Sequence, residues 1–177
     1  MPGFAYSAAS TRRIHASDAD VFGYLDDHRN LSAHMEQRSW AMMGSRMNVH
    51  MDAGGTRAVG SRFGFAGNFL GIPLAVEEIV TERDPPRTKA WVTVGEPTLW
   101  VIGRYRMGFT VVADASSSVL TVSIEYDLPQ GRGTRAAGRL LGGFYARWCT
   151  GRMAADAARH FETQDATAGP RGMRLGG

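Results

Sequence analysis

Glu78 is the acidic residue of this 177-residue chain whose neighbours best suit acid–base chemistry. If Val76 and Val80 point into the protein, the two-residue period of a strand points Glu78 inward as well. Burial of its carboxyl would then raise the pKa toward the range that a general acid or base needs. Ile79 favours the opposite face, and a bulge at this point would turn Glu78 to solvent. Both orientations stay open.

Tyr105 and Tyr126 are the other two candidates for catalysis. They fall on the expected inward faces of two strands that we expect to be neighbours. Their hydroxyls could bind a ligand carbonyl or stabilise an enolate, as polar tips in an apolar pocket often do. The alternative is that both are ordinary core tyrosines, hydrogen-bonded to the backbone.

Other reactive residue types offer less. His50 and Asp52 share a strand face, which can orient an imidazole for base catalysis. Arg46 and Asn48 lie on that face too and indicate that it meets solvent. Cys149 falls in an apolar helical stripe with Tyr145 and Met153, which predicts a buried thiol rather than a nucleophile. The histidines lack metal-ligand spacing, so we expect no metal and no cofactor.

A larger set of apolar and sulfur-containing side chains is expected to line the interior. Methionine adapts to irregular shapes, and tyrosine and tryptophan combine an apolar body with a polar tip. Such a lining suits a flat or flexible apolar ligand with a few oxygens, although the same residues could equally form a plain core. The expected ligand-binding residues are Met47, Met51, Phe63, Phe65, Tyr105, Met107, Tyr126, Phe144 and Trp148.

The elements that position these residues follow from the hydrophobic period. A short strand is expected at 10–16, followed by a helix capped by Ser17 or Asp18 and a second short helix at 31–36. Period-two alternation from 39 to 128 predicts a meander of about six further strands. The period then becomes helical and predicts one long helix over 134–161.

Several local motifs resemble those of the START-like, or SRPBCC, superfamily. They are IHAS at 14–17, GSRF at 60–63, VTERDPP at 80–86 followed by Trp91, and YDLP at 126–129. This superfamily includes polyketide cyclases and dehydrases and lipid-transport domains, and the resemblance covers roughly 11–161. It implies an α+β helix-grip fold: a curved antiparallel sheet of about seven strands wraps around the long C-terminal helix, with two short helices after the first strand. No catalytic set of a characterised cyclase is matched.

Composition narrows the class of protein further. The arginines are scattered, the net charge is only +3, and no nucleic-acid motif accompanies them, so no nucleic-acid partner is expected. No apolar run is long enough to cross a bilayer. The N-terminus does not resemble a secretory signal and one cysteine allows no internal disulfide, which favours a cytoplasmic protein; a bacterial source is expected as well. We expect one domain over 1–162 and a flexible tail over 163–177; the oligomeric state is not predicted.

These features predict a protein that binds a hydrophobic small molecule, such as a lipid, an isoprenoid or an aromatic polyketide-like compound, between sheet and helix. One alternative is a cofactor-independent cyclase or dehydratase that uses the same pocket. The other is a protein-interaction module whose cavity is filled by side chains. A fold alone does not choose among them.

Overall fold

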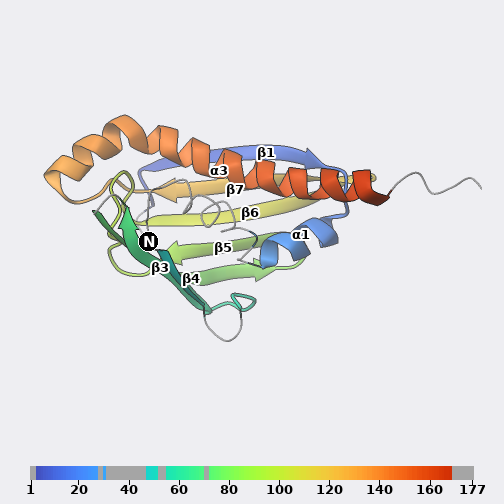
Figure 1. Cartoon of the computed structure of the whole chain (residues 1–177), viewed down its shortest axis with the longest axis horizontal. Coiled ribbons are helices and arrows are strands. Elements are labelled where there is room, and N and C mark those ends of the chain that lie inside the picture. Colours follow the sequence, from blue (N-terminus) through green and yellow to red (C-terminus); the bar gives the residue numbers. More distant parts are fainter. Residues whose placement is uncertain (1–2, 28–29, 31–46, 52–54, 70–71, 169–177) are drawn as a thin grey trace, which may run out of the picture.

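The computed structural model describes residues 3–27, 30, 47–51, 55–69 and 72–168 (Figure 1). In chain order the elements are β1 (Tyr6–Ile14), α1 (Asp18–Asp26), β2 (Met47–Met51), β3 (Arg62–Phe69), β4 (Ile72–Asp84), β5 (Thr88–Thr93), β6 (Tyr105–Asp114), β7 (Ser117–Tyr126) and α3 (Arg132–Ala168). The second short helix, expected at 31–36, lies outside the described residues.

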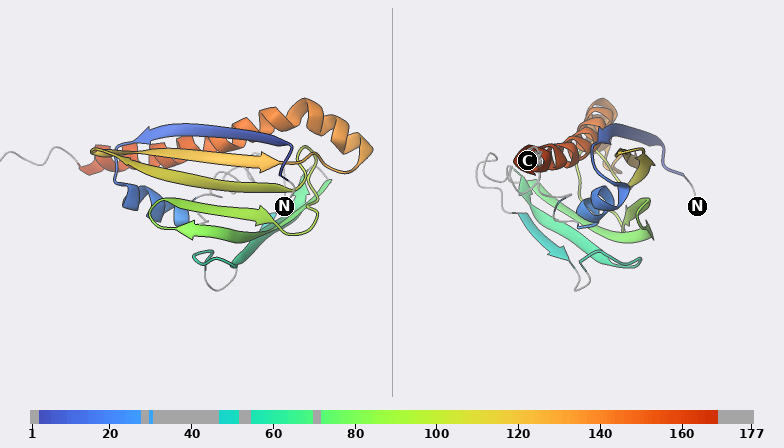
Figure 2. Two further views of the ribbon diagram at one scale, coloured as in Figure 1. Left: turned by 180° about the vertical axis from the view of Figure 1, so that it is seen from behind. Right: turned by 90° about the vertical axis from the view of Figure 1, so that its right-hand side faces the viewer.

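The strands form one antiparallel sheet in the order β1-β7-β6-β5-β4-β3-β2. Figure 2 shows this sheet bending so that its concave face turns toward α3 and α1. Strand β7 shows how one face of the sheet becomes the buried face: Leu120, Val122 and Ile124 are buried while Ser123 and Glu125 are exposed, so every second side chain enters the core. The predicted helix-grip fold is therefore confirmed.

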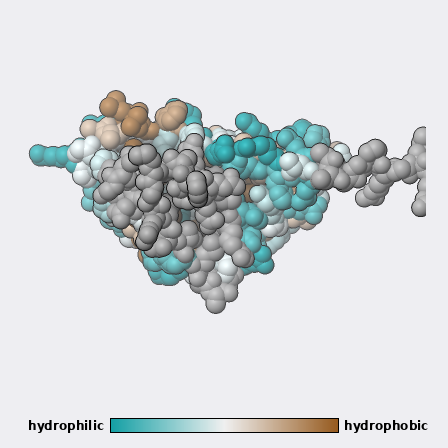
Figure 3. Space-filling model, viewed as in Figure 1, coloured by the Kyte–Doolittle hydropathy of each residue, from teal (hydrophilic) through white to brown (hydrophobic). Residues whose placement is uncertain are grey.

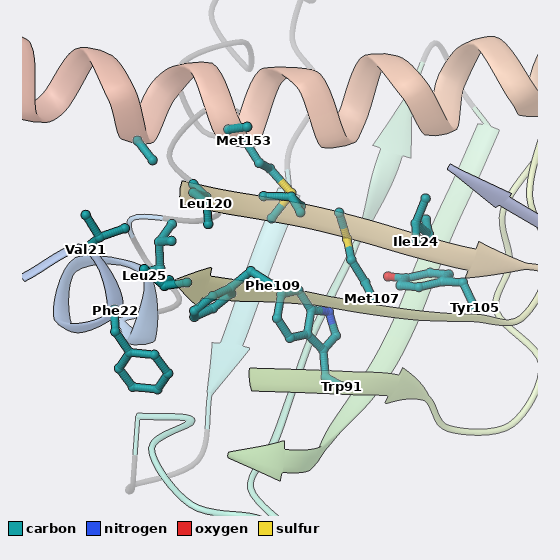
Figure 4. Close-up of a cluster of buried hydrophobic side chains, with 14 of the residues drawn as sticks. Val21, Phe22, Leu25, Trp91, Tyr105, Met107, Phe109, Leu120, Ile124 and Met153 are labelled. Carbon is teal, nitrogen blue, oxygen red and sulfur yellow. The ribbon is translucent and has the colours of Figure 1, made fainter. Parts of the chain in front are cut away.

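Helix α1 closes one end of the concave face. Ser17 caps it, because the Ser17 hydroxyl accepts a hydrogen bond from the Asp20 amide at 3.1 Å. Its apolar side packs onto β6 and β7, where the rings of Phe22 and Phe109 lie 5.5 Å apart. Figure 4 shows the same cluster continuing through Leu120 to Met153 of α3. This end of the interior is a hydrophobic core.

An ion cluster fastens α1 to the sheet. Lys89, the only lysine of the chain, is 0% exposed, and its ammonium donates to Asp26 Oδ1 at 3.0 Å and to the Asp26 carbonyl at 2.8 Å. Arg83 donates to both carboxylate oxygens of Asp26, at 3.1 and 2.8 Å. Burial raises the pKa of Asp26, but the hydrogen bonds from Arg83 and Lys89 outweigh burial and leave that pKa lowered. The carboxylate is thus held in its charged form.

Helix α3 lies along β1 and β7 and also contacts α1. It begins two residues before the predicted start and continues to Ala168, past the predicted end at 161. The extension has a simple cause, because no glycine or proline interrupts the chain between Phe161 and Gly169. Neither described helix has the length and apolarity that a bilayer crossing requires.

Candidate functional site

Glu78 points into the protein from β4. It pairs in register with Phe63 of β3 and Thr93 of β5, both of which are buried. The irregularity in β4 falls between Val80 and Glu82, beyond Glu78, so it does not turn this side chain outward. Glu78 is only 5% exposed. The register thus selects the inward one of the two orientations that the sequence left open.

The carboxyl of Glu78 is hydrogen-bonded to neighbours on the same concave face. The Tyr105 hydroxyl donates to Glu78 Oε1 at 2.7 Å. Burial raises the pKa of Glu78 from its ordinary 4.5 to about 7, while hydrogen bonds from Tyr105 and Trp91 act in the opposite direction. Glu78 therefore changes its protonation near neutral pH, which is the property required of a general acid or base.

Helix α3 presents two further polar side chains to this region. Tyr145 and Cys149 are one helical turn apart, and their side chains are hydrogen-bonded to each other. Burial raises the pKa of Cys149 to about 11 against the effect of that bond, so the thiol stays protonated and is a poor nucleophile. The charge of Glu78 further raises the pKa of Cys149, so the sheet and helix groups interact electrostatically. We call Glu78, Tyr105, Tyr145 and Cys149 the interior cluster.

Tyr126 is buried and pairs directly with Tyr105 in the β6–β7 register. Its contacts lead elsewhere, however. Its ring stacks on Tyr6 with 5.4 Å between centroids, and its hydroxyl lies 3.6 Å from where a Cβ on Gly142 would be. The structure thus brings Tyr105 and Glu78 together and leaves Tyr126 between β1 and α3.

Besides Tyr105 and Tyr126, four of the nine expected lining residues are buried or partly buried. Phe63 and Met107 are buried on the concave face, where Phe63 meets Trp91 edge-on with 6.3 Å between ring centroids. Phe65 is partly buried on the same face, and Trp148 is half-buried with its ring 6.2 Å from that of Tyr145. These four residues remain candidate ligand contacts.

The structure treats the other three lining residues differently. Met47 pairs with Gly67 and Met51 with Phe63 in the β2–β3 register, but their side chains lie outside the description. Phe144 is 66% exposed, so its expected place in the lining is wrong. The reason is that glycines, rather than the large apolar residues, form the sheet-facing side of this part of α3.

Sequence reasoning missed Trp91 and Tyr145 as members of the site. Trp91 entered only through a family-like motif, and Tyr145 only as part of an apolar helical stripe with Cys149. The four-residue spacing of Tyr145 and Cys149 was a usable signal, because it places both on one helix face. Within the described ranges, no group of three or more His, Cys, Asp or Glu side chains is arranged to hold a metal ion.

Comparisons of sequence and structure relate the chain to known proteins. The sequence profile of the family described as "Polyketide cyclase / dehydrase and lipid transport" matches residues 6–161. No curated protein matches the chain. Among solved structures, the Zhui aromatase/cyclase from a Streptomyces species superimposes with a TM-score of 0.64 at 13% identity, covering 93% of this chain and 98% of that one.

Two other solved structures are similar in outline. Norcoclaurine synthase from Thalictrum flavum, in complex with a transition-state analogue, gives a TM-score of 0.60 at 16% identity and covers 93% of this chain and 99% of its own. A protein from Thermus thermophilus gives 0.58 at 13% identity, with 93% and 100% covered. At these identities the likeness concerns the fold alone.

Proposed function

Because the chain belongs to the polyketide cyclase/dehydrase and lipid transport family of the SRPBCC superfamily, we propose that it binds a hydrophobic small molecule between the curved sheet and α3. The ligand classes we favour are a lipid, an isoprenoid or an aromatic polyketide-like compound. The observation that carries the proposal is the interior cluster: a buried Tyr105–Glu78 hydrogen bond on the sheet, with Glu78 interacting electrostatically with Tyr145 and Cys149 of α3. A cytoplasmic setting in a bacterium is part of the same proposal.

Partly accessible side chains on the inner face support a space for the ligand. Phe65, Leu99 and Tyr145 pack against the core yet keep part of their surface accessible. The backbone of α3 approaches β1 and β7 at one edge of the sheet. Glu78 and Trp91 lie on β4 and β5, which are further from that edge. Large apolar side chains around a few polar groups are the usual lining of a small-molecule site.

Glu78 defines one polar feature of the ligand. A carboxyl group offers about four acceptor positions, and the hydrogen bonds from Tyr105 and Trp91 use two of them. The remaining positions can accept from a ligand hydroxyl, and the protonated form can donate to a carbonyl. The expected ligand therefore has an apolar body and one hydroxyl or carbonyl within reach of Glu78.

A cofactor-independent cyclase or dehydratase is the second candidate, and the raised pKa of Glu78 favours it. In such a reaction the Glu78 carboxylate takes a proton from the carbon beside a substrate carbonyl, and the Tyr105 hydroxyl stabilises the resulting oxyanion. The enolate carbon then attacks a second carbonyl, and Glu78 returns its proton to the alkoxide formed there. For dehydration, the Glu78 carboxylate removes a second proton from the same carbon, the bond to the new hydroxyl breaks, and the departing hydroxide takes that proton from Glu78 and leaves as water.

Native mass spectrometry of the purified full chain tests the binding proposal, followed by denaturation and identification of any released compound. We expect a bound apolar compound. Cys149→Trp should expel it, because an indole would fill the space beside Tyr145, while Cys149→Ser should keep it. Circular dichroism confirms that both variants are folded. Protein that carries no compound and takes up none of the favoured classes contradicts the proposal.

The variants Glu78→Gln and Tyr105→Phe separate binder from enzyme. Each removes about one hydrogen bond, worth roughly 1 kcal/mol, so a binder should keep its affinity within about tenfold. An enzyme should lose turnover of about 100-fold or more from Glu78→Gln while the site stays occupied. Unchanged turnover in Glu78→Gln would exclude the mechanism given above.

A further inference from the structure

The first half of α3 carries an exposed apolar surface. Leu140, Leu141 and Phe144 are 83%, 52% and 66% exposed. Their spacing places them on one side of the helix, with Phe144 one turn beyond both Leu140 and Leu141. Figure 3 shows hydrophobic atoms gathered above the N-terminal part of α3. Single exposed apolar residues are ordinary, but three large ones in adjoining positions form a patch that needs an explanation.

The packing of α3 fixes this exposure. Gly138 and Gly142 face the rest of the protein so closely that a Cβ on either would lie 3.0 and 2.9 Å from the Val101 carbonyl oxygen. Ala146, one turn further on, is fully buried. Large side chains cannot replace these small ones, so rotation of the helix cannot bury the patch. Leu140, Leu141 and Phe144 must face outward whenever the domain is folded.

Positive charge surrounds the patch. From 128 to 155 the chain contains five arginines and no aspartate or glutamate, a local concentration that the overall scatter of arginines conceals. Arg152 pairs with Asp156 at 3.2 Å. The other four are exposed, and within the described part of the chain no carboxylate forms an ion pair with them: Arg132, Arg135, Arg139 and Arg147.

We infer that this side of α3 docks onto an anionic phospholipid bilayer. The docking face consists of Leu140, Leu141 and Phe144 together with Arg132, Arg135, Arg139 and Arg147. A helix with large apolar side chains on one face and flanking arginines lies at the membrane interface with the apolar groups among the acyl chains. The long arginine side chains reach the lipid phosphates from there.

A bilayer suits the docking face better than a protein partner does. A stable protein interface uses about 20–30 residues on each side, far more than this short segment of helix offers. A bilayer needs no shape complementarity, and its negative charge complements an arginine-only surface. The inference does not depend on the proposed function, although docking would place the interior cluster next to a source of hydrophobic molecules.

Vesicle co-sedimentation of the full chain tests the inference. We expect binding to vesicles of equal parts phosphatidylcholine and phosphatidylglycerol, weakening as salt is raised, and little binding to phosphatidylcholine alone. Leu140→Gln with Phe144→Gln should weaken binding by about tenfold or more. Arg135→Gln with Arg139→Gln should weaken it by about fivefold for each arginine.

Two matched controls use residues outside the docking face. Val112 is 61% exposed on β6, so Val112→Gln removes a comparable apolar side chain and should leave binding unchanged. Arg87→Gln, in the turn between β4 and β5, removes an exposed positive charge and should also leave binding unchanged. Absence of binding to anionic vesicles at low salt overturns the inference. So does a dimer in light scattering that Leu140→Gln with Phe144→Gln converts to monomer, because the face would then cover a second copy of the chain.

Discussion

Replacing Glu78 by glutamine should stabilise the protein at alkaline pH and not at acidic pH. Burial raises the pKa of Glu78 from 4.5 to about 7, and one pKa unit corresponds to about 1.4 kcal/mol. Ionising this carboxyl therefore costs the folded protein roughly 3 kcal/mol. Glutamine keeps a carbonyl oxygen that accepts from Tyr105 but never ionises, so it avoids that cost.

The sign follows from proton linkage. With its pKa raised on folding, Glu78 binds its proton more tightly in the folded state than in the unfolded state. The stability of the native protein is therefore highest, for this group, below pH 4.5, falls as the pH rises to about 7 and is level above that. Relative to the native protein, Glu78→Gln should gain roughly 3 kcal/mol between pH 5 and pH 8. For a chain of this size the gain is about 6–12 °C in Tm.

Urea unfolding of both proteins at a series of pH values measures this difference. Glu82→Gln is the matched control, because Glu82 also lies on β4 but is exposed and pairs with Arg106 at 2.9 Å. Its effect on stability should stay below about 1 kcal/mol at every pH of the series. If Glu78→Gln destabilises the protein equally at pH 5 and pH 8, the carboxylate is stabilised in place and the acid–base role lacks its basis.

Three further predictions concern the scaffold. Asp26→Asn leaves the buried Lys89 ammonium without its carboxylate and should cost about 3–5 kcal/mol in urea unfolding. Because folding lowers the pKa of Asp26 below 3.8, the native protein loses stability as the pH falls through that lowered pKa, and this loss should be absent from Asp26→Asn. Lys89 should react with an amine-acylating reagent no faster than the protein unfolds, measured by mass spectrometry of its peptide along a urea series; rapid labelling in native buffer would show that the site opens. Gly142→Ala should destabilise the protein by about 1–3 kcal/mol, since the new Cβ would lie 2.9 Å from the Val101 carbonyl oxygen. Gly143→Ala is its control and should be neutral or stabilising by about 0.5–1 kcal/mol in the same assay, as the nearest atom is the end of a flexible arginine.

The fold was predictable because its pattern is repeated along many residues. In β7 the alternation of Leu120, Val122 and Ile124 with polar residues specifies which face is buried, and the confirmed sheet follows from several such strands. Glu78 was harder, since its neighbours Glu77 and Ile79 fit either face and only pairing with β3 and β5 decides between them. Local alternation cannot supply that information.

Two features could not be predicted from the sequence, for physical reasons. Lys89 is buried because of Asp26, 63 residues earlier, and a partner at that separation leaves no local signal. Phe144 was expected to face inward because hydrophobic periodicity assigns the larger apolar side to the core. In α3 the opposite holds, since Gly138 and Gly142 allow a close approach to the 97–103 loop that bulky residues would prevent.

The energetics of the interior cluster bear on its purpose. A leucine or methionine in place of Glu78 would suit the surrounding apolar face and avoid the cost of ionising a buried carboxyl at neutral pH, roughly 3 kcal/mol. That cost is a large share of the total stability of a domain, about 5–15 kcal/mol. Asp26 shows the alternative arrangement, in which a buried carboxylate is balanced by two cations and stabilises the fold. Glu78 has hydroxyl and indole donors but no cationic partner among the described residues, so it fits a group kept for what it binds or reacts with rather than for stability.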